Sequence, residues 1–67
     1  MKLLFINKIN KAILDYVDNI DILPNVGNHI NLYDEEYIIR GILFDYSKHS
    51  INAYVSKATA NDVTYMN

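Results

Sequence analysis

The chain has no cysteine or tryptophan, and only one proline and two glycines, among its 67 residues. Without cysteine it has no disulfide, thiolate metal site or cysteine nucleophile, which is typical of a reducing cytosol. Its formal net charge is −2, so it lacks the basic excess of a protein that binds a nucleic-acid backbone. A chain this short buries only about 60% of its unfolded surface, so we expect a single domain that is stabilised as a homo-oligomer.

Long apolar runs are also missing. The run near the N-terminus, Leu3 to Ile6, is far shorter than the roughly 7–15 apolar residues of a signal peptide. No run approaches the roughly 18 apolar residues of a membrane-spanning helix. These absences predict a soluble, cytoplasmic protein that has no membrane partner.

The sequence does contain segments in which apolar and polar residues alternate. Residues 29–33 alternate with a period of two, and 36–45 and 51–57 are rich in β-branched and aromatic residues. Polar turns at 34–35 and 46–50 separate these segments. Short alternating runs joined by polar turns predict antiparallel hairpins.

The first third of the chain is compatible with two structures. Residues 2–8 and 12–18 can form a hairpin around a turn at 9–11, but apolar residues within 9–20 also follow helical spacing. The hairpin is favoured because no capping residue begins the helix and β-branched residues are frequent. We therefore predict a mainly β domain over 1–57, with about five antiparallel strands in a curved sheet or small barrel. The alternative is an α+β fold with a helix at about 9–20, and 58–67 form a C-terminal tail or edge segment.

Strand parity predicts two different faces for the long strand. A turn at 34–35 directs Tyr37, Ile39, Gly41 and Leu43 toward a core. The opposite face then holds both apolar and polar side chains, namely Ile38, Arg40, Ile42, Phe44, Tyr46, Tyr54, His29, Asn31, Asn52 and Ser56. This second face is expected to be a subunit interface, to be covered by the N-terminal hairpin, or to bind a ligand.

Arg40 is the central residue of the ligand hypothesis because it is the only arginine and lies among aromatic residues. A guanidinium beside aromatic rings suits a nucleotide-like ligand. We expect Arg40 to bind phosphate and Tyr46 and Tyr54 to stack on a base, whereas substitution of Lys2 or Lys11 should change little. The remaining candidate ligand contacts on this face are His29, Asn31, Asn52 and Phe44.

Catalytic and metal chemistry have little support in the sequence. The two histidines, His29 and His49, have no nucleophile motif near them. The acidic run at 34–36 has the composition of a solvated turn. Gly27 is expected to serve a turn and Gly41 a bulge or a close backbone approach. We predict a protein that is not an enzyme and has no metal or cofactor.

The segment Leu-Pro-Asn-Val-Gly-Asn-His-Ile-Asn-Leu, followed by Glu-Tyr-Ile-Ile and Leu-Phe-Asp-Tyr, resembles short β proteins of phages and mobile elements. These proteins share a Pro-x-Val-Gly-x-x-Ile motif and SH3-like character, and the resemblance covers about 23–55. Some of them look like anti-defence factors. The resemblance implies a small SH3-like barrel in the host bacterial cytoplasm and assigns no binding residues.

Three functions follow as expectations. The first is a non-catalytic phage-type protein, a sponge that sequesters a nucleotide-derived immune signal. The second is an inhibitor or regulator that binds a host enzyme through an exposed edge strand. The third is a small nucleic-acid-binding barrel, which the net charge of −2 disfavours.

Overall fold

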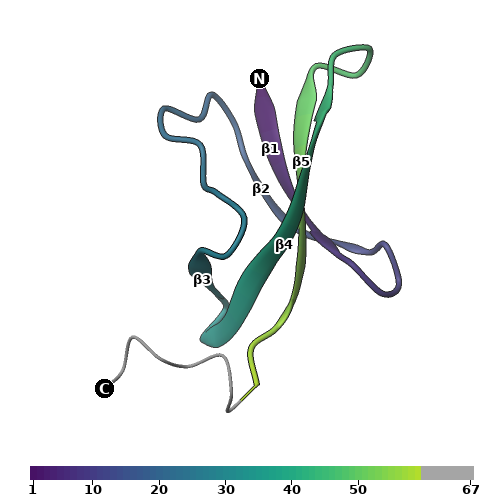
Figure 1. The fold of residues 1–67 in the computed structure, drawn as a ribbon. Coiled ribbons are helices and arrows are strands. Elements are labelled where there is room, and N and C mark those ends of the chain that lie inside the picture. Colours follow the sequence, from purple (N-terminus) through teal and green to yellow (C-terminus); the bar gives the residue numbers. More distant parts are fainter. Residues whose placement is uncertain (60–67) are drawn as a thin grey trace.

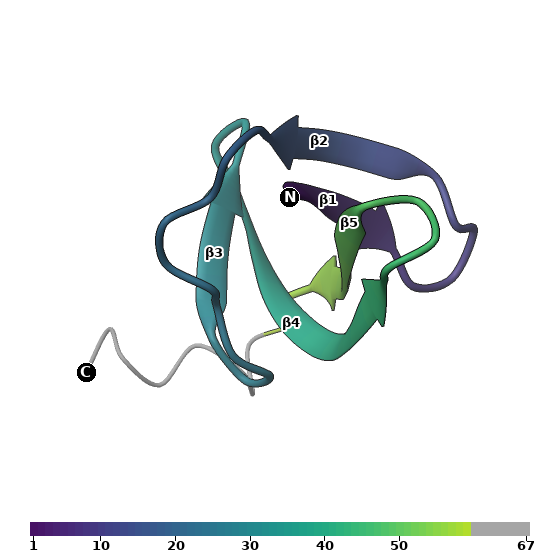
Figure 2. The ribbon, with the colours of Figure 1, turned by 90° about the horizontal axis from the view of Figure 1, so that it is seen from above.

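The structure is a computed structural model that describes residues 1–59. The strands are β1 (Lys2–Asn7), β2 (Ile13–Val17), β3 (His29–Leu32), β4 (Glu35–Asp45) and β5 (Ser50–Lys57). They form one sheet in the order β2-β1-β5-β4-β3, which curls into a half barrel (Figures 1 and 2). The predicted curved five-stranded β fold is confirmed. One feature differs from the prediction: β1 and β5 run parallel, whereas all other neighbouring strands are antiparallel.

The first third of the chain forms the predicted hairpin. Asn7 closes its loop, because its backbone N–H donates to the carbonyl of Ala12 at 2.8 Å. The side-chain oxygen of Asn7 also accepts from the backbone N–H groups of Ile9 and Asn10, at 2.9 and 3.3 Å. Asparagine stabilises turns in this way. The helical alternative at 9–20 is wrong, since this segment contains β2 and no helix.

The core lies inside the curl of the sheet and is richest on the central strands. Leu3, Ile39 and Val55 are the largest fully buried side chains, and they come from β1, β4 and β5. The other buried members of the core cluster are Phe5, Leu32, Tyr37, Ile51 and Ala53. Because β1 and β5 are adjacent, the two ends of the described chain together form the middle of the core.

The turn between β3 and β4 is one residue earlier than predicted. Tyr33 and Asp34 both have positive φ, at 55° and 65°, as in the tight turns that match the twist of a hairpin. The side chain of Asn31 accepts the Asp34 backbone N–H at 3.1 Å. Leu32 therefore pairs with Glu35. This shift of two residues in pairing leaves Tyr37 on the core side, as predicted, and places His29 opposite Ile38 rather than Arg40.

A β-bulge at Arg40 divides β4. Ile39 pairs with Val55 and Gly41 pairs with Tyr54, so Arg40 is an extra residue. An extra residue reverses the faces beyond it. Gly41 thus belongs to a bulge, one of the two predicted roles. The other role, a close backbone approach, is not seen among the described residues, since a Cβ there would have nothing within 4 Å.

The bulge corrects the predicted second face. Ile42 and Phe44 lie opposite the core residues Ala53 and Ile51, so they are on the core side of the sheet and not beside Tyr54. Ile38 is only 5% exposed. Residues 1–59 therefore do not present the continuous apolar face that we predicted for self-association, and an oligomer remains a prediction without this surface.

The segment that precedes β3 docks on β4. Gly27 has φ of 94° and donates its N–H to the carbonyl of Ile39 at 2.8 Å. The carbonyl of Asn28 accepts the N–H of Ile39 at 3.0 Å. Gly27 thus serves the turn that the sequence indicated, because φ of this sign favours glycine.

The predicted boundary after Lys57 coincides with the end of β5. Ala58 adds one more hydrogen bond to the pairing of β5 with β4, in which its N–H donates to the carbonyl of Glu36 at 3.0 Å. The rest of the predicted tail segment 58–67 lies, beyond Thr59, outside the described residues. Over the described range, the chain forms no helix with the length and apolarity needed to cross a membrane.

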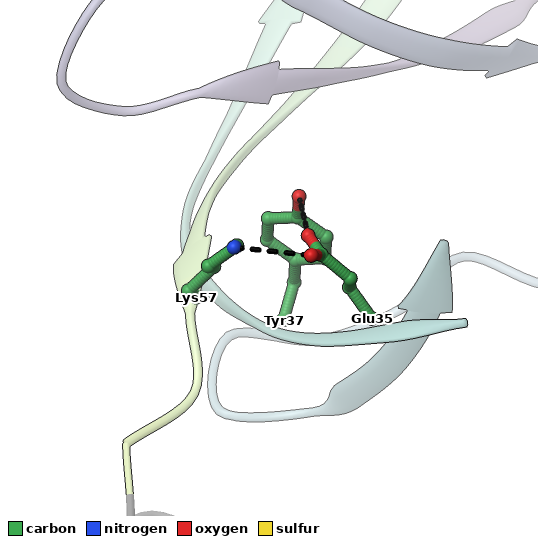
Figure 3. A network of polar contacts seen from close by, with 3 residues as sticks. All are labelled: Glu35, Tyr37 and Lys57. Atoms are coloured by element: carbon green, nitrogen blue, oxygen red, sulfur yellow. Dashed lines mark hydrogen bonds and ion pairs between the residues drawn. The ribbon is translucent and has the colours of Figure 1, made fainter. Parts of the chain in front are cut away.

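A polar network joins the ends of β4 and β5 (Figure 3). Glu35 accepts one hydrogen bond from the Lys57 ammonium and one from the Tyr37 hydroxyl, both at 3.1 Å. These contacts lower the pKa of Glu35, and the bond from Lys57 has the largest effect. Burial raises the pKa of Tyr37, and the hydrogen bond to Glu35 adds to this effect.

We expect this network to make the melting temperature depend on pH. A carboxyl whose pKa is lowered by folding stabilises the protein above its ordinary value of 4.5, and this contribution is lost as pH falls through the lowered pKa. A tyrosine whose pKa is raised contributes below 10.0, and this contribution is lost as pH rises through the raised pKa. The melting temperature of Lys57→Met, measured by circular dichroism, should therefore fall less steeply than that of the wild type as the pH is lowered into the acid range.

The control for this experiment is Asp21→Asn, which removes an exposed loop carboxylate. Its acid decline should match that of the wild type. An unchanged acid decline in Lys57→Met would show that the network does not couple folding to protonation.

Candidate ligand-binding pocket

The face of the sheet opposite the core is called the outer face here. Along β5, Ile51, Ala53 and Val55 are buried in the core. Side chains alternate across a strand, so Asn52, Tyr54 and Ser56 project from the outer face. All three are only partly exposed.

A pocket of ≈ 220 Å³ opens on this face and is lined by Lys8, Lys11, Arg40, Gly41 and Tyr54. Three parts of the fold meet here: the loop after β1, the bulge in β4 and the middle of β5 at Tyr54. Lys8 reaches the pocket because its backbone N–H donates to the carbonyl of Val55 at 2.8 Å, which continues the parallel pairing of β1 with β5.

The β1–β2 loop also positions Lys11. Its backbone has φ of 65° and donates to the carbonyl of Asn7 at 2.8 Å. Its ammonium donates to the carbonyl of Lys8 at 2.9 Å and lies 5.2 Å from the centroid of the Tyr54 ring. The separation is within the range of a cation–π contact, so the ring helps to hold the ammonium over the pocket.

The bulge places Arg40 and Gly41 on the opposite side of the pocket. Nε of Arg40 donates to Oγ of Ser56 at 2.8 Å, which holds the exposed guanidinium against the outer face. Gly41 is the direct partner of Tyr54 across the sheet. Directly opposite side chains normally contact each other, so the missing side chain leaves space beside the Tyr54 ring.

The pocket is positively charged, although the whole chain has a formal net charge of −2. Three of the six lysine and arginine side chains line it, and among the described residues 1–59 no carboxylate does. Over residues 1–59, no group of three or more His, Cys, Asp or Glu side chains could hold a metal ion. The lining can therefore attract an anion with oxygen acceptors, and Tyr54 adds an apolar ring with a hydroxyl.

The structure brings together two of the predicted site residues, Arg40 and Tyr54. Tyr46 lies in the turn that precedes β5. This strand begins at Ser50, which is four residues, or about 13 Å along the strand, from Tyr54. It stacks on Phe44, with ring centroids 6.3 Å apart. Neither Phe44 nor Tyr46 lines the pocket.

The three polar candidates for ligand contact, His29, Asn31 and Asn52, also lie outside the pocket lining. His29 on β3 contacts the Glu36 carboxylate through Nδ1. Asn31 accepts the turn N–H described above. Asn52 accepts a hydrogen bond from the Ser50 hydroxyl at 3.1 Å. These side chains support local structure within the described residues.

Sequence reasoning missed Lys8 and Lys11. Lys11 was expected to have little effect, but it lies over Tyr54. The sequence signal for them is that Lys8 and Lys11 flank Ile9 and Asn10 at the predicted turn. Lysines at turns are common on protein surfaces. Only the pairing of β1 with β5 brings these lysines beside Arg40.

Comparisons with family models, with curated proteins and with solved structures find no match to this chain. The chemistry of the pocket is therefore the basis for a functional proposal.

Proposed function

We propose that this chain is a non-catalytic binding protein that captures a small, phosphate-bearing, nucleotide-like ligand in the pocket. The observation that carries the proposal is the convergence of Lys8, Lys11 and Arg40 around Tyr54 in the described part of the chain. Phosphate oxygens are strong acceptors for lysine and arginine donors. Among the described residues, the lining has no imidazole or carboxylate, the side chains that most often act as general acid or base, and this supports capture over turnover.

The biological role we propose is counter-defence by a phage-type protein that removes a nucleotide-derived immune signal from the host bacterial cytoplasm. A sequestering protein needs affinity and no reaction, which agrees with the pocket's side chains. The resemblance of residues 23–55 to short phage β proteins supports this role.

The proposal is tested by incubating the purified protein with ATP, a cyclic mononucleotide and a cyclic dinucleotide in separate samples. Unbound nucleotide is removed, the protein is heat-denatured, and the released material is identified by chromatography. We expect at least one nucleotide to be retained and released intact. A chemically altered product would indicate an enzyme, and retention of none would overturn the proposal.

A second candidate function is inhibition of a host enzyme through β2, an edge strand of the sheet. Ile13, Tyr16 and Val17 of this strand are 61%, 54% and 44% exposed. An exposed edge strand with apolar side chains can pair with a strand of another protein. This candidate would become the leading one if no nucleotide were retained.

A further inference from the structure

The pocket is small for a whole nucleotide. Its volume is ≈ 220 Å³, whereas sites that enclose drug-sized ligands have volumes of about 300–1,000 Å³. The pocket can hold the phosphate groups or the base, but not both. The other part of a bound nucleotide would lie outside it.

The position of Lys11 favours the phosphate groups. Its ammonium lies over the ring of Tyr54, at 5.2 Å from the centroid. A base could stack on that side of the ring only after displacing the ammonium. A phosphate group would instead meet Lys11 where it already lies, with the ring holding the lysine in place.

The number of positive charges indicates a chain of phosphates. A terminal phosphate carries about −1.5 to −2 charges near pH 7 and three acceptor oxygens, whereas a cyclic phosphodiester carries a single charge per phosphate. Three cationic side chains line the pocket. Within residues 1–59, the ion pairs that the structure shows do not use Lys8 or Lys11. Their charges are therefore not offset by a described carboxylate at contact distance.

We infer that the pocket is a phosphate-chain site, which binds the terminal phosphates of a linear nucleotide or inorganic polyphosphate and leaves the base outside. This inference rests on the proposed function and specifies its ligand class. In this site Lys8, Lys11 and Arg40 contact phosphate oxygens, and Tyr54 positions Lys11. The identity of the base contributes little to affinity.

Isothermal titration calorimetry with inorganic tripolyphosphate, ATP, GTP, cyclic AMP and adenosine tests this inference. We expect tripolyphosphate, ATP and GTP to bind within about threefold of one another, and cyclic AMP at least about tenfold more weakly, because it offers fewer charge-assisted contacts. Adenosine should not bind. If cyclic AMP binds and tripolyphosphate does not, the inference fails and the proposed function stands. If none of the five binds, the inference fails, and the proposed function fails with it unless the cyclic dinucleotide is retained in the experiment above.

Variants separate the two roles that are possible for Tyr54. If Tyr54 is a positioning residue, Tyr54→Leu should weaken the binding of tripolyphosphate and of ATP by the same factor, whereas Tyr54→Phe should keep the ring and the affinity. If Tyr54 stacks on the base instead, Tyr54→Leu should weaken ATP alone, which would overturn the inference. Lys11→Met should weaken both probes about tenfold, as expected for one lost charge-assisted contact. The matched control is Lys48→Met, in the turn between β4 and β5, which should bind both probes like the wild type.

Discussion

Arg40→Ala is expected to weaken ATP binding about 10- to 150-fold, because a lost charge-assisted hydrogen bond costs roughly 1.5–3 kcal/mol. The fold should remain intact, since Arg40 is exposed and is the extra residue of the bulge. Calorimetry measures the affinity, and circular dichroism measures the melting temperature of the same sample.

Two control variants accompany this experiment. Arg40→Lys keeps the charge but loses the planar fork of the guanidinium, so it should recover only part of the affinity. Lys48→Ala should bind like the wild type, because Lys48 does not line the pocket. If Arg40→Ala binds normally and Lys48 or Lys57 substitutions abolish binding, the site lies at the hairpin ends and not at the bulge.

The largest expected effect on stability is that of Ile39→Ala. Ile39 is 0% exposed, and both of its backbone polar groups bond to the segment before β3. Truncation of a buried isoleucine costs about 2–5 kcal/mol, whereas a chain of this length has a total stability of only about 3–10 kcal/mol. The urea midpoint should therefore fall sharply, and the melting temperature should drop by at least about 10 °C.

Leu43→Ala is the matched control for this variant. Leu43 lies on the same strand beyond the bulge and is 50% exposed. Its truncation should lower the free energy of unfolding much less than the truncation of Ile39 does. Equal urea midpoints for the two variants would contradict the assignment of Ile39 to the core.

The strands could be predicted because their signals are local. Alternation over 29–33 and β-branched residues over 36–45 and 51–57 gave strands close to the observed ones. In the first third, the missing capping residue and the frequent β-branched residues favoured a hairpin over a helix. These signals depend on the pleat of a strand and on turn chemistry, and neither requires knowledge of distant neighbours.

The register and the site could not be predicted, because each depends on one residue or on a distant pairing. Tyr33 takes positive φ, which is unusual for a bulky residue, so the more polar pair after it was taken as the turn. Gly41 indicated a bulge, but one inserted residue decides which face Ile42 and Phe44 occupy. No local pattern signals that β1 pairs in parallel with β5, and this pairing brings Lys8 and Lys11 to the pocket.

The parallel pairing of β1 with β5 also determines how the chain folds. Lys2 pairs with Ser50, a separation of 50 − 2 = 48 residues, and the three fully buried large side chains come from β1, β4 and β5. Neither end of the chain can form the core alone, so the nascent β1–β2 hairpin must wait until β5 has been synthesised. Sheets with such long-range pairing fold in roughly milliseconds to seconds. During that interval the unpaired edges of β1 and β5 are open to pairing with other chains, which makes high expression rates a risk for aggregation.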